Sequence, residues 1–347
     1  MTNIVIYIII KQTCCVINFI MFNNKTILIT GGTGSFGKNF AKFLLKNHQP
    51  KKLIIFSRDE FKQFKMAEEM EDARLRFFLG DVRDLPRLER AFAGVDIVIH
   101  AAALKQVPTL EYNPTEAIKT NVIGSQNVIE AAINNKARKV LLVSSDKAVH
   151  PINLYGATKL CAEKLFVAAN SYSPHATLFS AVRYGNVIGS RGSIIETLTA
   201  SHKATGKVKI THPDMTRFWL TLDQSFELVT FAVKNMEGGE IFVPKIPSMK
   251  LKDLFDAIVP AAKKEIIGLR PGEKMHEILL TENESKNALL VGSYFVILPE
   301  ITSTGNTYKK HHRAGKKLKK DYKFASDTNT AWLTKKNFKD KIKINLL

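Results

Sequence analysis

A glycine-rich turn near the start of this chain joins an apolar segment to an amphipathic one and constrains the fold more than any other feature. Thr26 to Thr30 reads TILIT, the pattern of a buried strand. Gly31, Gly34 and Gly37 follow, and apolar residues then recur at helical spacing as far as Leu44. Ordinary turns also contain glycine, but a strand before them and a helix after them favour a turn that binds phosphate at the helix N-terminus. The sequence therefore predicts the start of a dinucleotide-binding fold.

Strand-like and helical patterns alternate along most of the chain. This alternation is typical of an α/β protein with a Rossmann-type doubly wound parallel sheet, in which ligands bind beyond the carboxyl ends of the strands. After residue 186 the alternation decays, which predicts a smaller substrate-binding region toward the C-terminus. Further strands are expected at 53–56, 77–79, 95–100, 140–143, 178–183 and 240–243, and helices at 114–134 and 223–235.

The end of the second predicted strand bears on the choice of cofactor. A carboxylate there binds the ribose 2′-hydroxyl of NAD, whereas hydroxyl and guanidinium groups suit the 2′-phosphate of NADP. Ser57 and Arg58 favour NADP, Asp59 and Glu60 keep NAD possible, and a surface loop with incidental charge is the alternative. The residues expected to bind the cofactor are Gly31, Thr33, Gly34, Ser35, Phe36, Gly37, Ser57, Arg58, Lys62, Asp81, Val82, Ala101, Ala103, Lys105, Tyr155 and Lys159.

The stretch 140–159 gathers the groups that can transfer protons. Ser145, Asp146 and Lys147 follow an apolar strand, and Tyr155 and Lys159 lie four apart, on one helix face. An ammonium near Tyr155 would lower the pKa of its phenol, which could then take a proton from an alcohol during oxidation. A packed tyrosine beside a surface lysine and an exposed Asp-Lys dipeptide are the plainer interpretations.

The chain carries a formal charge of +19, which invites a nucleic-acid or membrane-surface interpretation. Much of the excess lies in residues 309–323 and 334–343, which predicts a solvated basic tail at the C-terminus. This tail lacks the interleaved aromatic residues of a platform that stacks bases. We therefore expect neither a nucleic acid nor a membrane as a partner.

The cysteines and the first residues bear on the compartment. Three cysteines form no disulfide framework and no metal-ligand spacing, which indicates a reduced, cytoplasmic setting and no metal. Residues 1–20 are apolar, but Lys11, Gln12 and Asn18 interrupt them, so the run is too short to span a membrane. We expect this leader to be dispensable and the folded domain to begin at Met21.

Several motifs, in order, carry a resemblance to a known family. KTILITGGTGSFG and the Tyr155-x-x-x-Lys159 pattern resemble the extended short-chain dehydrogenases/reductases. GDVRD, HAAALKQVP, SSDKA, NLYGATK, VRYGNVIGSRGS and IIGLRPGEKMHE are similar, more narrowly, to the inverting UDP-N-acetylglucosamine 4,6-dehydratases of pseudaminic acid synthesis. The resemblance covers about residues 24–333. Ser145 stands where that family often has threonine, and the match is loose after Pro299.

The resemblance implies a lyase that acts on UDP-N-acetylglucosamine. Its cofactor would be tightly bound NADP, which is regenerated at each turnover. Tyr155 and Lys159 would serve oxidation at C4, and Ser145 would hydrogen-bond the same oxygen. Lys147 would be the base at C5, provided that its pKa is depressed, and Asp146 the acid that helps the 6-hydroxyl leave. The Asp-Lys pair, where retaining dehydratases carry Asp-Glu, is what links the resemblance to inversion at C5.

The resemblance also implies substrate contacts and an organisation. Guanidinium groups suit bidentate binding of a diphosphate, although arginines in loops are usually solvated. The expected division is a leader (1–20), an NADP-binding domain (21–185), a substrate-binding region with segments that return to the first domain (186–333), and a tail (334–347). A homo-oligomer, a dimer or a hexamer, is expected. The expected substrate-binding residues are Lys105, Lys147, Asn186, Arg191, Arg217, Arg270 and Glu273.

Four alternatives stay open. Within the fold, a retaining 4,6-dehydratase or a UDP-sugar 4-epimerase would use the same oxidation at C4. Outside catalysis, the chain could be an NADP sensor or a basic nucleic-acid-binding protein. Sensors of this fold tend to lose the tyrosine that is present here at position 155. A steep dependence of nucleic-acid affinity on salt would favour the last alternative.

Overall fold

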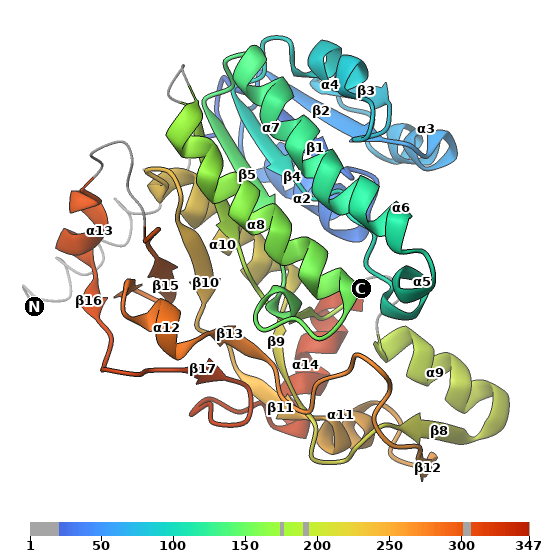
Figure 1. The fold of residues 1–347 in the computed structure, drawn as a ribbon. Helices are drawn as coiled ribbons and strands as arrows, with labels where there is room; N and C mark the ends of the chain where they lie inside the picture. Colours follow the sequence, from blue (N-terminus) through green and yellow to red (C-terminus); the bar gives the residue numbers. More distant parts are fainter. Residues whose placement is uncertain (1–20, 174–176, 190–193, 301–306, 347) are drawn as a thin grey trace, which may run out of the picture.

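The computed structural model describes residues 21–173, 177–189, 194–300 and 307–346 (Figure 1). The predicted leader, residues 1–20, and the predicted substrate residue Arg191 lie outside these ranges.

A ten-stranded sheet forms the centre of the molecule, in the order β16-β14-β15-β10-β6-β5-β4-β1-β2-β3. The run from β3 to β10 is parallel, whereas β15, β14 and β16 pair antiparallel. The expected doubly wound sheet is confirmed, and the expected strands lie within two residues of the observed bounds. The strands are β1 (Thr26–Thr30), β2 (Lys52–Ser57), β3 (Leu75–Leu79), β4 (Ile97–His100), β5 (Lys139–Val143), β6 (Leu178–Val182), β10 (Ile241–Pro244), β14 (Ala288–Val291), β15 (Tyr294–Ile297) and β16 (Lys316–Lys317).

Helices cover both faces of the sheet, because residues of a buried strand alternate between its two sides. Ile27 and Ile29 face one core with α2 (Ser35–Asn47), α3 (Glu60–Glu69) and α10 (Leu222–Asn235). Leu28 faces the other core, with α4 (Leu85–Phe92), α7 (Gly124–Asn134) and α8 (Leu154–Tyr172). Figure 1 shows α7 and α8 in front of the parallel strands and α2 behind them.

The single helix expected at 114–134 is divided into three parts. It consists of α6 (Pro114–Ile118), a π-helical turn (Lys119–Ile123) and α7. The π turn buries Asn121, whose side chain bonds both the N–H and the carbonyl of Leu104 at 2.8 and 2.9 Å. The turn is only five residues long and apolar residues continue through it, so nothing in the sequence marks it.

A smaller region, built mainly from later residues, packs below the carboxyl ends of the parallel strands. Its core gathers apolar residues from β8 (Lys207–Ile210), β9 (Thr216–Leu220), α11 (Leu251–Ile258) and α14 (Lys335–Leu346). The expected basic tail is therefore not free. Phe338 of α14 is buried and meets Trp219 in an edge-to-face contact. Its other elements are β7 (Asn186–Val187), α9 (Ile194–Thr205), β11 (Ser248–Lys250) and β12 (Lys263–Ile266).

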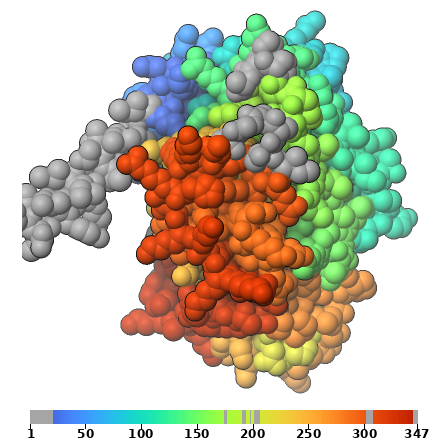
Figure 2. Space-filling view, turned by 60° about the vertical axis from the view of Figure 1, so that its left-hand side comes forward, coloured from blue at the N-terminus to red at the C-terminus, as the bar shows by residue number. Residues whose placement is uncertain are grey.

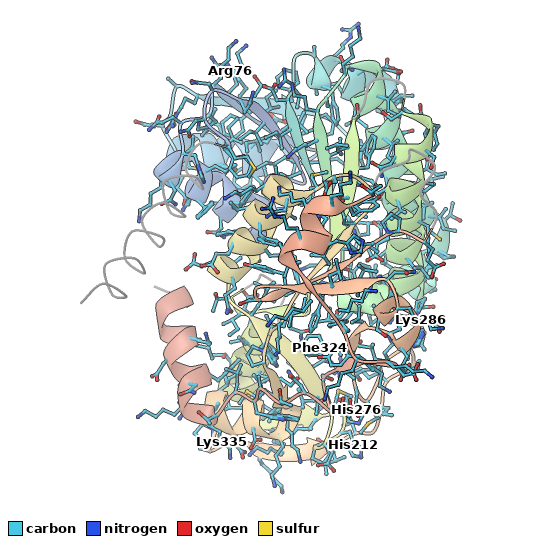
Figure 3. The ribbon with its side chains drawn as sticks, turned by 90° about the vertical axis from the view of Figure 1, so that its left-hand side faces the viewer. Arg76, His212, His276, Lys286, Phe324 and Lys335 are labelled. Carbon is cyan, nitrogen blue, oxygen red and sulfur yellow. The ribbon has the colours of Figure 1, made fainter. Side chains whose placement is uncertain are left out.

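The C-terminal third of the chain crosses between the two regions. Figure 2 shows its residues, coloured orange to red, gathered on one face of the molecule. β17 (Phe324–Ala325) pairs with β13 (Ile278–Leu280). The ring of Phe324 packs against those of Phe218 and Phe295, with centroid distances of 4.7 and 5.1 Å. Figure 3 places Phe324 well inside the molecule, between Arg76 on the outer strand β3 and Lys335 at the start of α14. The short helices are α5 (Val107–Tyr112), α12 (Glu282–Ser285) and α13 (Lys309–Ala314).

Over the described residues, no helix combines the length and the apolar composition that a membrane span requires.

Candidate active site

A cavity of about 640 Å³ opens at the carboxyl ends of β1, β4, β5 and β6. It brings together the glycine turn, the end of β2, the alanines after β4, and the residues after β5. Asp81, Arg217, Arg270 and Glu273 do not line it. The predicted residues that do are Gly31, Thr33, Gly34, Ser35, Phe36, Gly37, Ser57, Arg58, Lys62, Val82, Ala101, Ala103, Lys105, Ser145, Asp146, Lys147, Tyr155, Lys159 and Asn186.

The glycine turn has the shape that a dinucleotide requires. Gly31 has φ +64°, and a Cβ there would lie 2.8 Å from the backbone of Ala102. A side chain would therefore fill the space between the turn and the strand end after β4. No side chain caps the N-terminus of α2 at Gly34. The first backbone N–H groups of this helix therefore lie at the glycine turn, beside the cavity. The residues present thus fit the diphosphate of a nicotinamide dinucleotide.

Two expected cofactor-binding cations lie near the end of β2: Arg58, which favours a 2′-phosphate, and Lys62, in the first turn of α3. Arg58 is exposed and lies 3.4 Å from the carboxylate of Asp81. Lys62 pairs with Asp59, which also caps the N-terminus of α3 by accepting a bond from the Lys62 N–H at 2.9 Å. Asp59 is therefore occupied within its own helix turn, rather than pointing a free carboxylate at a ribose.

A short 3₁₀ turn, Asp146–Ala148, follows β5 and begins at Ser145. The Asp146 N–H donates to the carbonyl of Tyr184 at 3.0 Å, which fixes the turn against the end of β6. Both the Ser145 hydroxyl and the Lys147 ammonium donate to Asp146 Oδ1, at 2.8 and 3.0 Å. The Asp146 side chain is 1% exposed, so a buried ion pair lies on the cavity wall.

Helix α8 approaches this turn so closely that only glycine fits between them. A Cβ at Gly156 would lie 2.1 Å from the carbonyl oxygen of Lys147. Asn153 begins the helix by accepting a bond from the Gly156 N–H at 2.8 Å, and its amide donates to Gly272 O at the same distance. This contact brings Tyr155, on the first turn of α8, next to Ser145 and Lys147.

The cation that acts on Tyr155 is not the one expected. Burial raises the pKa of the Tyr155 phenol, and the charge of Lys147 and a hydrogen bond with Ser145 oppose that rise without cancelling it. The expectation that Lys159 lowers this pKa is therefore corrected. Lys159 donates to the carbonyl of Val143 at 2.7 Å, and burial lowers its own pKa to about 8 against the opposing charge of Glu163.

The pKa of Lys147 is also shifted opposite to the expected direction. Burial alone would lower it, but the carboxylates of Asp146 and Glu277 raise it well above its usual value. The charge of Arg217, which would lower it, is outweighed. Lys147 is therefore an ammonium in this structure. Lys105, on the same cavity, has the depressed pKa that was expected of Lys147, because it is partly desolvated.

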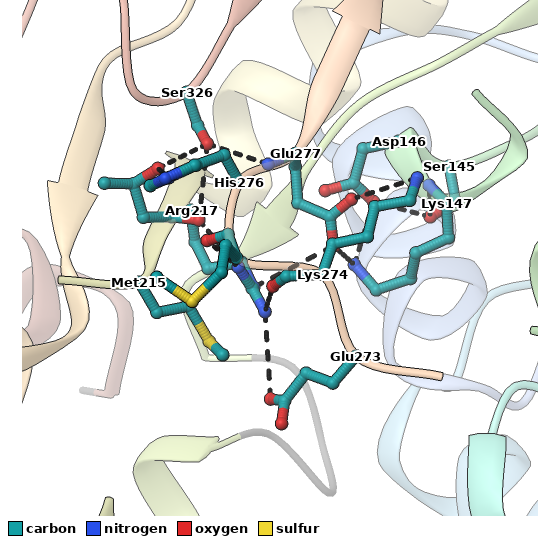
Figure 4. A network of polar contacts seen from close by, with 12 residues as sticks. Ser145, Asp146, Lys147, Met215, Arg217, Glu273, Lys274, His276, Glu277 and Ser326 are labelled. Carbon is teal, nitrogen blue, oxygen red and sulfur yellow. Dashed lines mark hydrogen bonds and ion pairs between the residues drawn. The ribbon is translucent and has the colours of Figure 1, made fainter. Parts of the chain in front are cut away.

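Glu277 is a residue of this neighbourhood that sequence reasoning missed. Its side chain is 3% exposed and lies 3.4 Å from Lys147 Nζ (Figure 4). Lys274 and Arg217 lie 3.7 and 3.9 Å from the same carboxylate. The signal was present in the motif IIGLRPGEKMHE, whose last residue is Glu277, but nothing in the motif says that it folds back onto Lys147.

The predicted substrate residues of the second region lie in different environments. Arg217 is buried and donates to the carbonyls of Thr216 and Lys274 at 2.7 and 2.9 Å. Arg270 is exposed, and Glu273 lies 3.7 Å from Arg217. Arg217 therefore holds the wall behind Lys147 together, whereas Arg270 is the one whose guanidinium faces solvent.

One cluster of metal-type side chains lies elsewhere in the described part of the chain, at Glu237, Glu240 and His311. Both oxygens of Glu240 already accept hydrogen bonds, including one with His311 at 2.9 Å and one from Ser180 at 2.6 Å. The Glu240 carboxylate thus fastens α13 to the end of the sheet and has no oxygen left without a partner.

The fold and the cavity, with Tyr155 and Lys159 one helical turn apart beside a glycine-rich turn, define an extended short-chain dehydrogenase/reductase. The chain belongs to the family described as polysaccharide biosynthesis protein, whose model matches residues 27–299.

The similar proteins include dehydratases and epimerases. The chain is 48% identical over 322 residues to a UDP-N-acetylglucosamine 4,6-dehydratase (inverting) from Campylobacter jejuni, which covers 91% of this chain and 96% of that one. It is 43% identical over 331 residues to a UDP-glucose 4-epimerase from Rickettsia typhi, which covers 92% and 96%. Among solved structures, Pen from Bacillus thuringiensis has a TM-score of 0.84 at 40% identity, covering 94% and 99%.

Proposed function

We propose that this protein removes water from UDP-N-acetylglucosamine across C5 and C6 after oxidation at C4, and inverts the configuration at C5. The product is a UDP-2-acetamido-2,6-dideoxy-4-keto-hexose of the arabino configuration, made in the cytoplasm as the first step of pseudaminic acid synthesis. The observation that carries the proposal is the buried Asp146–Lys147 pair beside Tyr155. The C. jejuni relative, a UDP-N-acetylglucosamine 4,6-dehydratase (inverting), supports it.

NADP is the proposed cofactor, in preference to NAD. Arg58 and Lys62 bring two cations to the end of β2, and Asp59 is engaged as the cap of α3. Guanidinium groups bind phosphate in a bidentate manner, which suits a 2′-phosphate. A bound nicotinamide would accept a hydride from C4 and return one to C6, so the cofactor ends each turnover unchanged.

Ser145, Tyr155 and Lys159 form what we call the oxidation group. Tyr155 takes the proton of the 4-hydroxyl, and the ammonium of Lys147 favours the phenolate that this requires. Ser145 hydrogen-bonds the same oxygen. Lys159 lines the cavity, donates to the Val143 carbonyl, and would hold the nicotinamide ribose.

Asp146 and Lys147 carry the elimination. Oxidation at C4 makes the C5 proton acidic, since it lies α to a carbonyl. The Lys147 ammonium must first give up a proton, and its hydrogen bond to Asp146 Oδ1 offers a route. Transfer along this bond leaves a neutral amine and a carboxylic acid. The amine takes the C5 proton, and the acid protonates the departing 6-hydroxyl, which leaves as water. When a hydride adds to C6, C5 takes a proton on the face opposite the one that lost it, which inverts its configuration.

The substrate diphosphate is proposed to lie toward Asn186, Lys105 and the exposed Arg270. Asn186 and Lys105 line the cavity, and the Gly272 loop that follows Arg270 is tied to Asn153 at the start of α8. Glu273 is the proposed partner of the uridine ribose. A homo-oligomer remains a proposal from the family resemblance.

The experiment is to incubate purified, cofactor-loaded protein with UDP-N-acetylglucosamine and analyse the sugar nucleotide by mass spectrometry and proton NMR. We expect a product lighter by one water molecule, with a methyl group at C6. An intact substrate in the presence of folded, loaded protein would contradict the proposal.

UDP-sugar 4-epimerisation is the second candidate, because the R. typhi relative is a UDP-glucose 4-epimerase. An epimerase needs the oxidation group but has no use for the Asp146–Lys147 pair. A product that keeps its 6-hydroxyl and differs only at C4 would favour this candidate. A dehydrated product with unchanged C5 would instead indicate a retaining dehydratase.

A further inference from the structure

A buried carboxylate stands behind the lysine that we propose as the base. Glu277 Oε1 lies 3.4 Å from Lys147 Nζ (Figure 4). Among the described residues that line the cavity, Lys147 is present and Glu277 is not. Glu277 therefore does not line the cavity itself, and Lys147 is the cavity residue with which it forms an ion pair.

Glu277 is held rigidly by its backbone. Its N–H donates to the Ser326 hydroxyl at 2.9 Å, and the Ser326 N–H donates to the Glu277 carbonyl at 2.8 Å. The Ser326 hydroxyl also bonds the hydroxyl of Thr216 at 2.6 Å. Ser326, which follows β17, thus fixes the backbone from which this carboxylate extends.

The carboxylate is not fully satisfied by its fixed neighbours. Arg217 Nε and Lys274 Nζ lie 3.9 and 3.7 Å away, outside hydrogen-bonding distance, and Glu277 Oε2 is buried without a hydrogen-bond partner. Leaving a buried carboxylate oxygen without a bond costs free energy.

We propose that Glu277 is a positioning residue of the reaction: together with Asp146 it holds the Lys147 amine at the cavity wall and sets when that amine is neutral. Five charged groups and one phenol surround this point: Asp146, Glu277, Lys147, Arg217, Lys274 and Tyr155. Two carboxylates flank Lys147 and raise its pKa. If one is removed, the positive charges of Arg217 and Lys274 are less well balanced, and the pKa of Lys147 falls. The effect of Glu277 on the titration of Lys147 does not depend on the proposed function; only its effect on the reaction rate does.

The test measures Lys147 directly and needs no turnover. Holoenzyme without substrate is treated with trace acetic anhydride over a range of pH, and acetylation of the Lys147 peptide is followed by mass spectrometry. Only the neutral amine reacts, so the midpoint reports its titration, and the exposed Lys52 is the internal reference. We expect Glu277→Gln, which keeps the shape and removes the charge, to shift the Lys147 midpoint down by at least about one pH unit.

Two further variants separate a charge effect from a structural one. Glu277→Asp keeps the charge but draws it away from Lys147, so its midpoint should fall between those of wild type and Glu277→Gln. Glu240→Gln removes another fully buried carboxylate, far from the cavity, and should leave the Lys147 midpoint unchanged. If neither Glu277 variant folds, Ser326→Ala decides, because it removes a hydrogen bond of the Glu277 backbone and leaves Asp146 in place; an unchanged Lys147 midpoint in that variant would overturn the inference.

The kinetic arm follows incorporation of solvent deuterium at C5. In Glu277→Gln the pH limb that Lys147 governs should move in the same direction as the labelling midpoint, with kcat affected more than KM. An unchanged labelling midpoint in Glu277→Gln, or an equal shift in Glu240→Gln, overturns the inference. A shifted midpoint in a protein that does not dehydrate UDP-N-acetylglucosamine would instead overturn the proposed function and leave the role of Glu277 in place.

Discussion

The two sets of residues around the cavity are assembled in different ways. The oxidation group, Ser145, Tyr155 and Lys159, comes from one strand end and the helix that follows it. The elimination group, which we define as Asp146, Lys147, Glu277 and Arg217, gathers residues from three separate segments, with Ser326 behind them. A group built from neighbouring residues can be shared by all members of a fold family, as oxidation at C4 is. A group built from distant segments lets one family add a further step, here the elimination.

The largest expected effect comes from removing the phenol that both sets depend on. Tyr155→Phe should lower turnover of UDP-N-acetylglucosamine by about 10²–10⁴-fold, because general acid–base catalysis typically contributes that much. Oxidation precedes elimination, so water loss and deuterium incorporation at C5 should fall together. The measurement is kcat for each, in protein shown to be folded by its melting temperature. A rate within tenfold of wild type would remove Tyr155 from the oxidation group.

Gly156→Ala should separate the two sets physically. The new Cβ would overlap the Lys147 carbonyl, so the first turn of α8 must move, at a cost of about 1–3 kcal/mol in the free energy of unfolding. Turnover should fall further than this loss of stability explains. Gly206→Ala is the comparison: Gly206 has φ +67°, unlike the helical Gly156, so an alanine there is strained by its backbone alone, and nothing lies within 4 Å of its Cβ position. Equal losses of turnover in both variants would contradict the close-contact argument.

Ser326→Ala should weaken only the elimination group. The variant loses the hydroxyl that holds the Glu277 N–H, and a hydrogen bond of this kind contributes about 1 kcal/mol. We expect water loss to slow roughly fivefold, since 1.4 kcal/mol corresponds to a factor of ten, while reduction of the cofactor by substrate keeps its rate. Ser285→Ala, in another buried serine far from the cavity, should change neither rate.

The last prediction concerns the stability of the oxidation group rather than turnover. The pKa of Lys159 is about 8 in the folded protein and ordinarily 10.5, so the unfolded chain binds more protons between these values. The penalty of charging buried Lys159 is thus fully present below pH 8, and the free energy of unfolding should rise from pH 8 to 10.5. Urea unfolding of cofactor-stripped Lys159→Met should lack this rise. Parallel curves for the two proteins would contradict the burial of a charge at Lys159.

The same contrast explains what the sequence could predict. The strands of the parallel sheet and the oxidation group were predictable, because periodicity and a four-residue spacing are local properties. The pKa of Lys147 was predicted in the wrong direction, because Glu277 lies 130 residues away and only the packing of β13 against the Asp146–Ala148 turn brings it close. The burial of Phe338 in the basic tail was missed for the same reason: its partner, Trp219, belongs to a distant strand.

The π turn at Lys119–Ile123 is a different kind of omission. Its sequence continues the apolar pattern of the flanking helices, so no residue marks it. The turn positions the side chain of Asn121, which hydrogen-bonds both the N–H and the carbonyl of Leu104. It braces the segment after the alanine run that lines the cofactor side of the cavity.

The account's central claim is that the two sets of residues perform separable steps, and Lys147→Ala tests it most directly. Loaded Lys147→Ala protein is mixed with UDP-N-acetylglucosamine in deuterated water; absorbance follows the reduced nicotinamide, and NMR follows the proton at C5. The account predicts that the cofactor becomes reduced while C5 keeps its proton and no water is lost. Deuterium at C5 at the wild-type rate, or a folded and loaded variant whose cofactor stays oxidised, would contradict it.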